Sequence, residues 1–201
     1  MNKIKQAALD LIIKDSCDLF LNRSINDVTV ADIAEKSEVG VATVYRYFST
    51  KKNIVEKCAI RLQKQVFEQY FQLDGQNGFE KIKKFYLSYL EIFNTHPEFY
   101  RFISEFDAFM MMENDSELEE YSNGLDLFRE EFYRTYQEGI ADGSIKKAED
   151  INLFYYATTH AILELCKKLS VDVRIVRQDE TIRKNEEIRA LAETFLSVLK
   201  A

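Results

Sequence analysis

Proline and glycine are scarce in this chain. Its 201 residues include 1 proline and 6 glycines. Sandwiches and barrels need many turns, which these two residues usually supply, so the count argues against an all-β fold. The length fits one large domain, or one domain with a small appendage. The composition therefore predicts an all-α protein.

Long apolar runs are also missing. No stretch of about eighteen apolar residues occurs, so we expect no helix that spans a bilayer. The first ten residues lack the basic start and continuous apolar block of a secretory signal. The three cysteines, Cys17, Cys58 and Cys166, are odd in number and far apart, which fits buried reduced thiols better than a disulfide framework. These observations predict a cytoplasmic protein with no membrane partner.

Motifs of catalysis and cofactor binding are absent. The chain contains no GxGxxG, Walker loop, CxxC or HExxH sequence, and we find no paired carboxylates or nucleophile–base pair. His160 and Glu164 share a helical face at metal-compatible spacing, but two ligands alone are weak evidence for a metal. We expect no enzyme, no cofactor and no metal site.

The charge is negative overall and unevenly distributed. A formal net charge of −7 by itself disfavours nucleic-acid binding, because phosphate neutralisation needs Lys and Arg. Residues 1–52, however, hold 8 Lys and Arg against 7 Asp and Glu, a net +1, whereas residues 53–201 hold 19 against 27, a net −8. Only the N-terminal part is therefore expected to approach DNA, with useful affinity requiring two copies at once.

Apolar residues recur at helical spacing along most of the chain. The pattern predicts about nine helices, with a polar loop or poorly packed helix over residues 170–184. The helices are expected near residues 3–21, 30–37, 41–47, 50–71, 79–94, 97–112, 114–141, 149–169 and 185–200.

The segment from Thr29 to Lys51 carries the clearest motif. Thr29 precedes Asp32 by three residues, which predicts a capping box at the start of a short helix. A three-residue turn then leads to a second short helix, so the segment predicts a helix-turn-helix unit whose second helix enters the major groove of DNA. Val44 and Phe48 are expected to face the core.

The outward set of the second helix is chemically suited to DNA. Arg46 can pair with phosphate or read guanine, and Thr43 can bond to phosphate or base. The tyrosine hydroxyls can donate to phosphate, and Lys51 adds charge beside free helix N–H groups. Small residues permit close backbone approach. The predicted contacts are Gly40, Val41, Ala42, Thr43, Tyr45, Arg46, Tyr47 and Lys51.

At these residues the chain resembles the TetR family of bacterial transcriptional regulators. The match runs from DLF at residues 18–20 through TVADIA at 29–34 to VGVATVYRYF at 39–48, with Lys51 three residues further on. The resemblance covers roughly residues 4–55. It implies a nine-helix homodimer that binds a palindromic operator, with a divergent C-terminal domain that binds a small molecule and releases the DNA. It also implies a phosphate contact for Thr29.

Three residues depart from the family pattern. Ser24, Glu38 and Ala42 stand where the family usually or often has glycine. A left-handed turn position costs a residue other than glycine about 1 kcal/mol, and an acidic side chain near DNA weakens binding. These departures are expected to modify the strength of DNA binding without removing the motif.

The middle of the chain is rich in aromatic residues. Residues 79–136 hold 15 of the 26 Phe and Tyr, about twice a proportional share, together with Met110, Met111 and Met112. A well-filled helical core explains many of these positions, but apolar walls with a few hydroxyl groups are also typical of ligand pockets. The predicted ligand-binding residues are Tyr86, Tyr89, Phe93, Phe102, Phe106, Phe109, Met110, Phe128 and Phe132.

The last two predicted helices favour dimerisation. Helix 149–169 is apolar on two faces, so one of its faces is free to meet a partner while the other packs inside. The C-terminal helix is expected to pack beside it in a two-fold four-helix interface, although burial within one chain remains the alternative. The predicted interface residues are Phe154, Tyr155, Ile162, Leu165, Leu191 and Phe195.

The sequence thus favours a DNA-binding domain at residues 1–50 and a ligand-binding and dimerisation domain at 51–201. The expected function is a ligand-responsive repressor that binds a palindromic double-stranded operator as a homodimer and is released by a small apolar or aromatic ligand. Two alternatives remain: a carrier or enzyme for apolar molecules on an all-α scaffold, and an adaptor or architectural DNA protein without a ligand.

Overall fold

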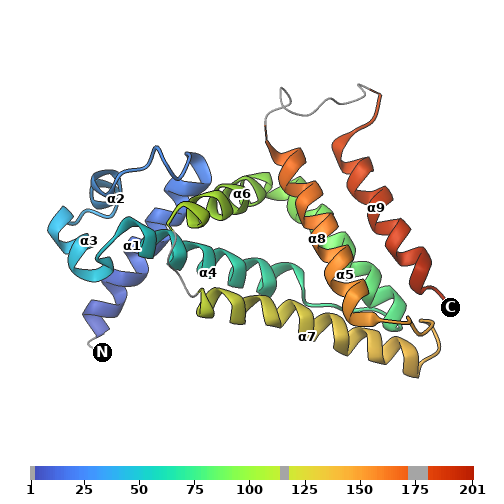
Figure 1. Cartoon of the computed structure of the whole chain (residues 1–201). Helices are drawn as coiled ribbons and strands as arrows, with labels where there is room; N and C mark the ends of the chain where they lie inside the picture. Colours follow the sequence, from blue (N-terminus) through green and yellow to red (C-terminus); the bar gives the residue numbers. More distant parts are fainter. Residues whose placement is uncertain (1–2, 114–117, 172–180) are drawn as a thin grey trace.

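The computed structural model describes residues 3–113, 118–171 and 181–201, and within these ranges it contains nine helices (Figure 1). Their bounds are α1 Lys3–Asn22, α2 Val30–Lys36, α3 Val41–Phe48, α4 Lys51–Tyr70, α5 Gly78–Thr95, α6 Pro97–Met112, α7 Glu119–Ala141, α8 Ile151–Ser170 and α9 Lys184–Leu199. The one sheet-like feature in this part of the chain is an isolated bridge between Ile145 and Lys200.

The all-α prediction is therefore confirmed, and the predicted helix ends agree with the structure to within a few residues. The expected start of the seventh helix at residues 114–116, and most of the expected loop at 170–184, lie outside the described residues. None of the described helices is long and apolar enough to cross a membrane.

Helices α1, α2 and α3 form one end of the molecule, which we call the head (residues 3–48), and helices α4 to α9 form the body (Figure 1). A first core lies under the head. It joins buried residues of α1, α2 and α3 to the first half of α4 and to one face of α6. The head is thus attached to the body through two helices, α4 and α6.

A second core lies within the body and is much richer in aromatic residues. Phe71, Phe85, Tyr86, Phe132 and Tyr155 all belong to it, and many of its rings meet edge to face. Such contacts stabilise a core beyond the area that they bury. Most of the aromatic residues in excess therefore fill the helical core, which was the alternative to a ligand pocket in the sequence analysis.

Two glycines allow α5 and α7 to cross closely. A Cβ added to Gly78 would lie 2.1 Å from the backbone nitrogen of Gly139. The free N–H groups at the start of α5 donate to the segment after α7: Gly78 N to Asp142 Oδ2 at 2.7 Å, and Phe79 N to Ser144 Oγ at 3.0 Å. The contact fixes the distal end of the body.

The three cysteines are free thiols and all are buried, as expected. Cys17 on α1 and Cys58 on α4 lie at the junction of these two helices, where Cys17 Sγ is 3.9 Å from the carbonyl oxygen of Cys58. Burial raises the pKa of the Cys58 thiol well above its usual value. All three behave as small core side chains.

Candidate DNA-binding surface and ligand cavity

The first helix of the helix-turn-helix unit begins with the predicted capping box. Thr29 Oγ1 accepts a hydrogen bond from Asp32 N at 3.1 Å, and Asp32 Oδ2 accepts one from Thr29 N at 2.7 Å. The hydrogen bonds from Thr29 are the main reason that the pKa of Asp32 is lowered. This cap fixes the start of α2 and holds the threonine side chain at the protein surface.

The turn between α2 and α3 contains a strained residue. Glu38 has φ 53°, in the left-handed region that favours glycine. Its N–H donates to Glu35 O at 3.1 Å, and the N–H of Val39 donates to Ala34 O at 2.9 Å, so backbone hydrogen bonds hold the turn. The expected cost of a non-glycine residue at position 38 therefore has a structural basis.

Helix α3 presents one face to the core and one face to solvent. Val44 and Phe48 are buried, as predicted, whereas Val41 and Tyr45 are 42% and 50% exposed. Gly40 caps the helix at its N-terminus and has open space around it. Also exposed are Ala42 and Arg46, while Thr43 is half-buried. This short helix thus offers the outward set that the sequence predicts.

Tyr47 is less exposed than the sequence analysis expects. It is half-buried against the head core, with the Arg46 guanidinium 5.1 Å and the Lys5 ammonium 5.8 Å from its ring centre. These cation–π contacts hold the ring at the edge of α3. Arg46 and Tyr47 therefore form one unit on the recognition helix.

Lys51 lies in the first turn of α4, beside the end of α3. Thr50 caps this helix by accepting from Asn53 N at 3.2 Å. The Lys51 ammonium is 6.0 Å from the ring centre of Phe109 on α6, and burial lowers its pKa. Phe109, predicted to bind ligand, thus lies instead where the head joins the body.

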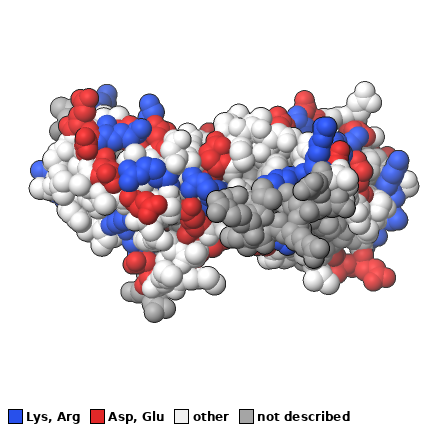
Figure 2. All heavy atoms as spheres, turned by 90° about the horizontal axis from the view of Figure 1, so that it is seen from above, with Lys and Arg blue, Asp and Glu red and all other residues white. Residues whose placement is uncertain are grey.

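On the face of the head that Figure 2 shows, the basic side chains do not form a single patch. Figure 2 shows Lys and Arg side chains interspersed with Asp and Glu over the end of the molecule formed by the head. This agrees with the net +1 of residues 1–52. A net charge of this size attracts phosphate only modestly. Specific contacts made by side chains of the recognition helix therefore have to supply much of the affinity for DNA.

A cavity of about 340 Å³ lies inside the body, bounded by α4, α5, α6, α7 and α8. Its size falls at the lower end of the roughly 300–1,000 Å³ that small-molecule sites occupy. The wall is mostly apolar and aromatic. Its lining residues include Phe71, Tyr89, Phe99, Tyr100, Ile103, Tyr121, Phe128, Tyr155 and Leu163.

Two of the nine residues predicted to bind ligand, Tyr89 and Phe128, line this cavity. The other seven lie elsewhere. Phe102, Phe106 and Met110 are buried in the head core, and Tyr86 and Phe132 are buried in the body core. Phe93 packs against the body core, and Phe109 against the head core.

The position of the predicted α6 residues outside the cavity lining has a simple physical cause. This helix is apolar on two sides: Phe102 and Phe106 are buried in the head core, Tyr100 lines the cavity, and Ile103 belongs to both. Helical spacing identifies residues that share a face, but it does not say which neighbour the face meets.

Arg101 and Glu105 join α6 to the end of α1. Arg101 Nη2 donates to the carbonyl oxygens of Phe20 at 3.1 Å and Leu21 at 2.5 Å. Glu105 accepts from Arg101 Nη1 at 2.9 Å and from Ile25 N at 2.7 Å. The sequence analysis missed this pair, which ties the cavity-lining helix directly to the head.

The polar groups of the cavity include one that the sequence analysis also missed. Gln63 on α4 is 5% exposed and lines the cavity, and its Nε2 has no hydrogen-bond partner among the described residues. Residues 55, 59, 62, 63, 66 and 70 fall at the spacing of a buried helical stripe. A glutamine on that stripe was the signal available in the sequence.

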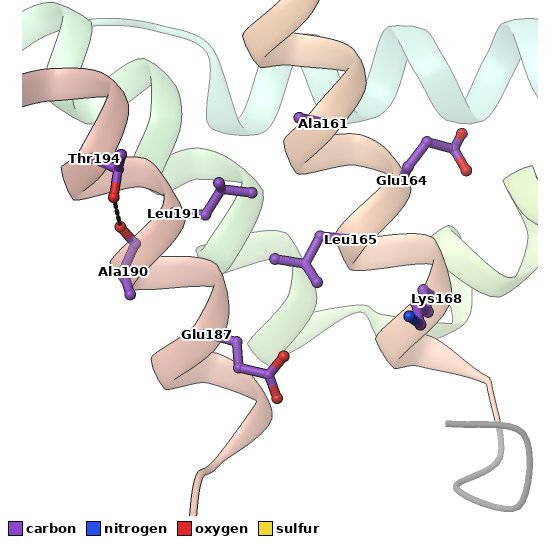
Figure 3. A pocket seen from close by; sticks show the side chains of 8 residues that line it. All are labelled: Ala161, Glu164, Leu165, Lys168, Glu187, Ala190, Leu191 and Thr194. Atoms are coloured by element: carbon purple, nitrogen blue, oxygen red, sulfur yellow. Dashed lines mark hydrogen bonds between the residues drawn. The ribbon is translucent and has the colours of Figure 1, made fainter. Parts of the chain in front are cut away.

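A groove between α8 and α9 marks the outer side of the body (Figure 3). Leu165 and Leu191, both predicted at a dimer interface, line it and are half-buried. Ile162 is fully buried inside the chain, and Tyr155 lines the cavity, so neither faces this groove. Phe154 and Phe195 are partly buried against the body core.

Helices α8 and α9 also carry exposed apolar residues outside the groove lining. Leu153 and Tyr156 on α8 are 66% and 42% exposed, and Val198 on α9 is 50% exposed. Leu153 and Tyr156 belong to the second apolar face predicted for helix 149–169, and Tyr156 also lines the cavity. Among the described residues, no group of three or more His, Cys, Asp or Glu could hold a metal ion.

The fold and the capped helix-turn-helix unit define a class: helical DNA-binding regulators with a separate cavity-bearing body. Residues 12–58 match the family model described as "Bacterial regulatory proteins, tetR family". The match covers the helix-turn-helix segment, so the chain is similar to TetR-family transcriptional regulators in its DNA-binding part.

Solved structures share the fold over nearly the whole chain. A TetR-family regulator from Rhodococcus sp. has a TM-score of 0.68 at 16% identity, covering 97% of this chain and 100% of its own. PfmR from Thermus thermophilus has a TM-score of 0.59 at 18% identity, and the match covers 94% of this chain and 99% of PfmR. The ketosteroid transcriptional regulator KstR2 of Mycobacterium tuberculosis has a TM-score of 0.57 at 16% identity, and the match covers 94% of this chain and 93% of KstR2. Among curated proteins, none matches this chain.

Proposed function

We propose that this protein is a homodimeric repressor that binds a palindromic operator and leaves it when a small apolar or aromatic ligand occupies the cavity. Residues 1–50 bind DNA, and residues 51–201 bind ligand and dimerise. The observation that carries the proposal is one connected arrangement: an exposed recognition helix is joined through α4 and α6 to a cavity inside the body.

The recognition helix supplies the DNA contacts. Arg46, Tyr45 and Thr43 reach bases or phosphates in the major groove, with Val41 available to a thymine methyl group. Gly40 and Ala42 permit close approach, and Thr29, Tyr47 and Lys51 bind flanking phosphates. The Arg46–Tyr47 contact at 5.1 Å orients the guanidinium before DNA arrives.

Two copies meet through the groove face of α8 and α9. Leu165 and Leu191 lie in the groove, and Leu153, Tyr156 and Val198 are apolar residues exposed on the same two helices. A two-fold axis through this face pairs each helix with its counterpart in a four-helix interface. The two recognition helices then meet successive major grooves of a palindrome.

Ligand binding acts on the head through a shift in population. Helices α4 and α6 both contribute cavity wall at one end and head core at the other. A ligand that favours one placement of these helices changes the spacing of the two recognition helices, so the dimer no longer fits the operator. Helix α4 acts as one lever, and the Arg101 contact makes α6 a second.

The experiment is selection of bound fragments from the source organism's genomic DNA, followed by titration of the best site at increasing salt. We expect a palindromic site with steep salt dependence. Sedimentation at micromolar concentration should find a dimer. A monomer at that concentration, or a best site without two-fold symmetry, would contradict the proposal.

A further inference from the structure

Gln63 is a buried amide in an apolar wall. It is 5% exposed and lies on α4 among cavity residues such as Val66, Phe71 and Leu163. Its Nε2 lacks a hydrogen-bond partner among the described residues. A buried polar group without a partner is destabilising, so this donor is a group that a bound molecule can satisfy.

The amide oxygen of Gln63 already has a neighbour. A Cβ added to Gly124 on α7 would lie 2.0 Å from Gln63 Oε1, so the oxygen faces a C–H group of this glycine. A weak C–H···O contact suits an oxygen and not an NH2 group. The amide oxygen is thus turned toward Gly124, and Nε2 is the atom of this cavity-lining side chain that is left without a partner among the described residues.

The charges on the wall cancel. Asp126 and Arg129 are the two oppositely charged lining residues, and their side chains form an ion pair at 2.9 Å. Arg129 Nη1 also donates to Tyr156 Oη at 3.0 Å. The Asp126 carboxylate offsets the charge of Arg129, so an anion that enters the cavity meets a guanidinium that is already paired.

The tyrosines point to the same conclusion. Burial raises the pKa of Tyr89, and burial is also the largest cause of the raised pKa of Tyr155. An environment that disfavours a phenolate anion also disfavours an anionic ligand. The hydroxyl groups remain neutral and available as hydrogen-bond partners.

We propose that the cavity takes a compact, neutral, mostly aromatic molecule with a hydrogen-bond acceptor such as a ketone oxygen, and that Gln63 Nε2 donates to that acceptor. This rests on the proposed function, because it takes the cavity as the ligand site. It goes further in naming the chemical class of the ligand and the residue that selects it. The hydrogen bond is made on α4, the helix that begins beside α3.

Three naphthalene probes test the chemistry. The first is 2-acetylnaphthalene, which carries a ketone; the second is 2-isopropenylnaphthalene, of the same shape without an acceptor; the third is the anion 2-naphthoate. Binding to the full-length protein is measured by calorimetry. We expect the ketone to bind roughly ten-fold more tightly than the hydrocarbon, as one buried hydrogen bond predicts, and 2-naphthoate to bind most weakly.

Two variants locate the effect. Gln63→Met removes the donor while keeping side-chain length, and the ketone-to-hydrocarbon preference should fall to about one-fold. Gln65→Met makes the same change at an exposed position of α4 and should keep the preference. Circular dichroism melts verify that both variants are folded.

Each result decides the inference. A preference present in wild type and Gln65→Met but lost in Gln63→Met supports it. An equal preference in all three proteins, tighter binding of 2-naphthoate, or no binding of any probe overturns it. Release of labelled operator by 2-acetylnaphthalene, measured by fluorescence anisotropy, distinguishes this inference from the proposed function. If the ketone preference depends on Gln63 but the operator is not released, only the proposed ligand-induced release is contradicted. If the operator is released but the ketone is not preferred, only the role of Gln63 is contradicted.

Discussion

The two cores of this molecule differ in what fills them. The head core is mainly aliphatic, with residues such as Ile12, Val28 and Ile33, and it packs short helices against α4 and α6. The body core is richer in aromatic residues, which are 8 of its 20 buried members against 4 of 19 in the head core, and it borders a cavity of about 340 Å³ with a buried amide that has no partner among the described residues. Branched aliphatic side chains have few rotamers and hold one arrangement, whereas a cavity leaves room for more than one.

This difference separates two tasks. The head keeps α3 in one geometry, as a reader of DNA requires, because capping and packing specify each of its short helices. In the proposed function, the body changes when a ligand enters its cavity. Helices α4 and α6 contribute to both cores, so the proposal has this change reach the head through them.

The largest effect is expected where the body has least space. Gly78→Ala would place a Cβ 2.1 Å from the backbone of Gly139, so α5 and α7 must separate. Overpacking against backbone should reduce the free energy of unfolding by about 3 kcal/mol. Chemical denaturation measures this, with Gly75→Ala in the nearby exposed turn as the control, where the loss should be much smaller. Equal losses would mean that the helix crossing is not tight.

The next effect breaks the head without touching the body. Arg46→Ala combined with Tyr47→Ala removes the oriented guanidinium and the ring beside it. Operator affinity should fall about 100-fold, since one good base contact is worth about 1–3 kcal/mol and a phosphate contact is lost too. Fluorescence anisotropy measures the loss. Arg189→Ala on the exposed face of α9 is the matched control, and the recognition-helix assignment fails if both variants bind operator equally well.

The third prediction concerns the connection between the two parts. Arg101→Ala removes the guanidinium donor to two carbonyl oxygens at the end of α1 and one of the two donors to the Glu105 carboxylate. Loss of these partly buried bonds should cost about 2 kcal/mol. Hydrogen exchange should become faster in α1 and α2 while α8 keeps its protection. Arg134→Ala, which breaks a surface ion pair on α7, should change exchange little, and uniform acceleration in Arg101→Ala would contradict a local connection.

The fourth prediction removes the unpartnered amide that distinguishes the body core from the head core. Without ligand, Gln63→Met replaces a buried, unpartnered amide by an apolar side chain of similar length. The free energy of unfolding should increase by about 1 kcal/mol. Thermal or chemical denaturation tests this against Gln65→Met, which should change little. A loss of stability in Gln63→Met would show that the amide has a partner within the folded chain.

The smallest effect concerns the strained turn of the head. Glu38→Gly should stabilise the head by about 1 kcal/mol, because glycine adopts φ 53° without steric cost. It should also tighten operator binding slightly by removing a negative charge near phosphate. Glu38→Gln separates the two causes, since it removes the charge and keeps the strain. Equal unfolding free energies for wild type and Glu38→Gly would exclude strain at this position.

The head was far easier to predict than the cavity. Capping of α2 by Thr29, burial of Val44 and Phe48 and exposure of Tyr45 all follow from short-range patterns within twenty residues. The cavity is assembled from five helices, and its wall depends on how these helices pack. Of the predicted ligand-binding residues, Tyr89 and Phe128 line the cavity, whereas Phe102 and Phe106 are buried in the head core.

The same limit applies to the outer face of α8. Two apolar faces were predicted for this helix, and two exist, but sequence spacing assigned Ile162 to the partner and the structure buries it within the chain. Gln63 and Arg101 were missed because their roles depend on contacts with α7 and α1, far away in sequence.

The most direct test of the account measures ligand affinity with and without operator. If occupancy of the cavity controls the head, then the factor by which 2-acetylnaphthalene weakens operator binding must equal the factor by which saturating operator weakens 2-acetylnaphthalene binding. We predict equal factors of roughly ten-fold or more, within the usual range of allosteric coupling. A ligand affinity that operator leaves unchanged would contradict the coupling of body and head.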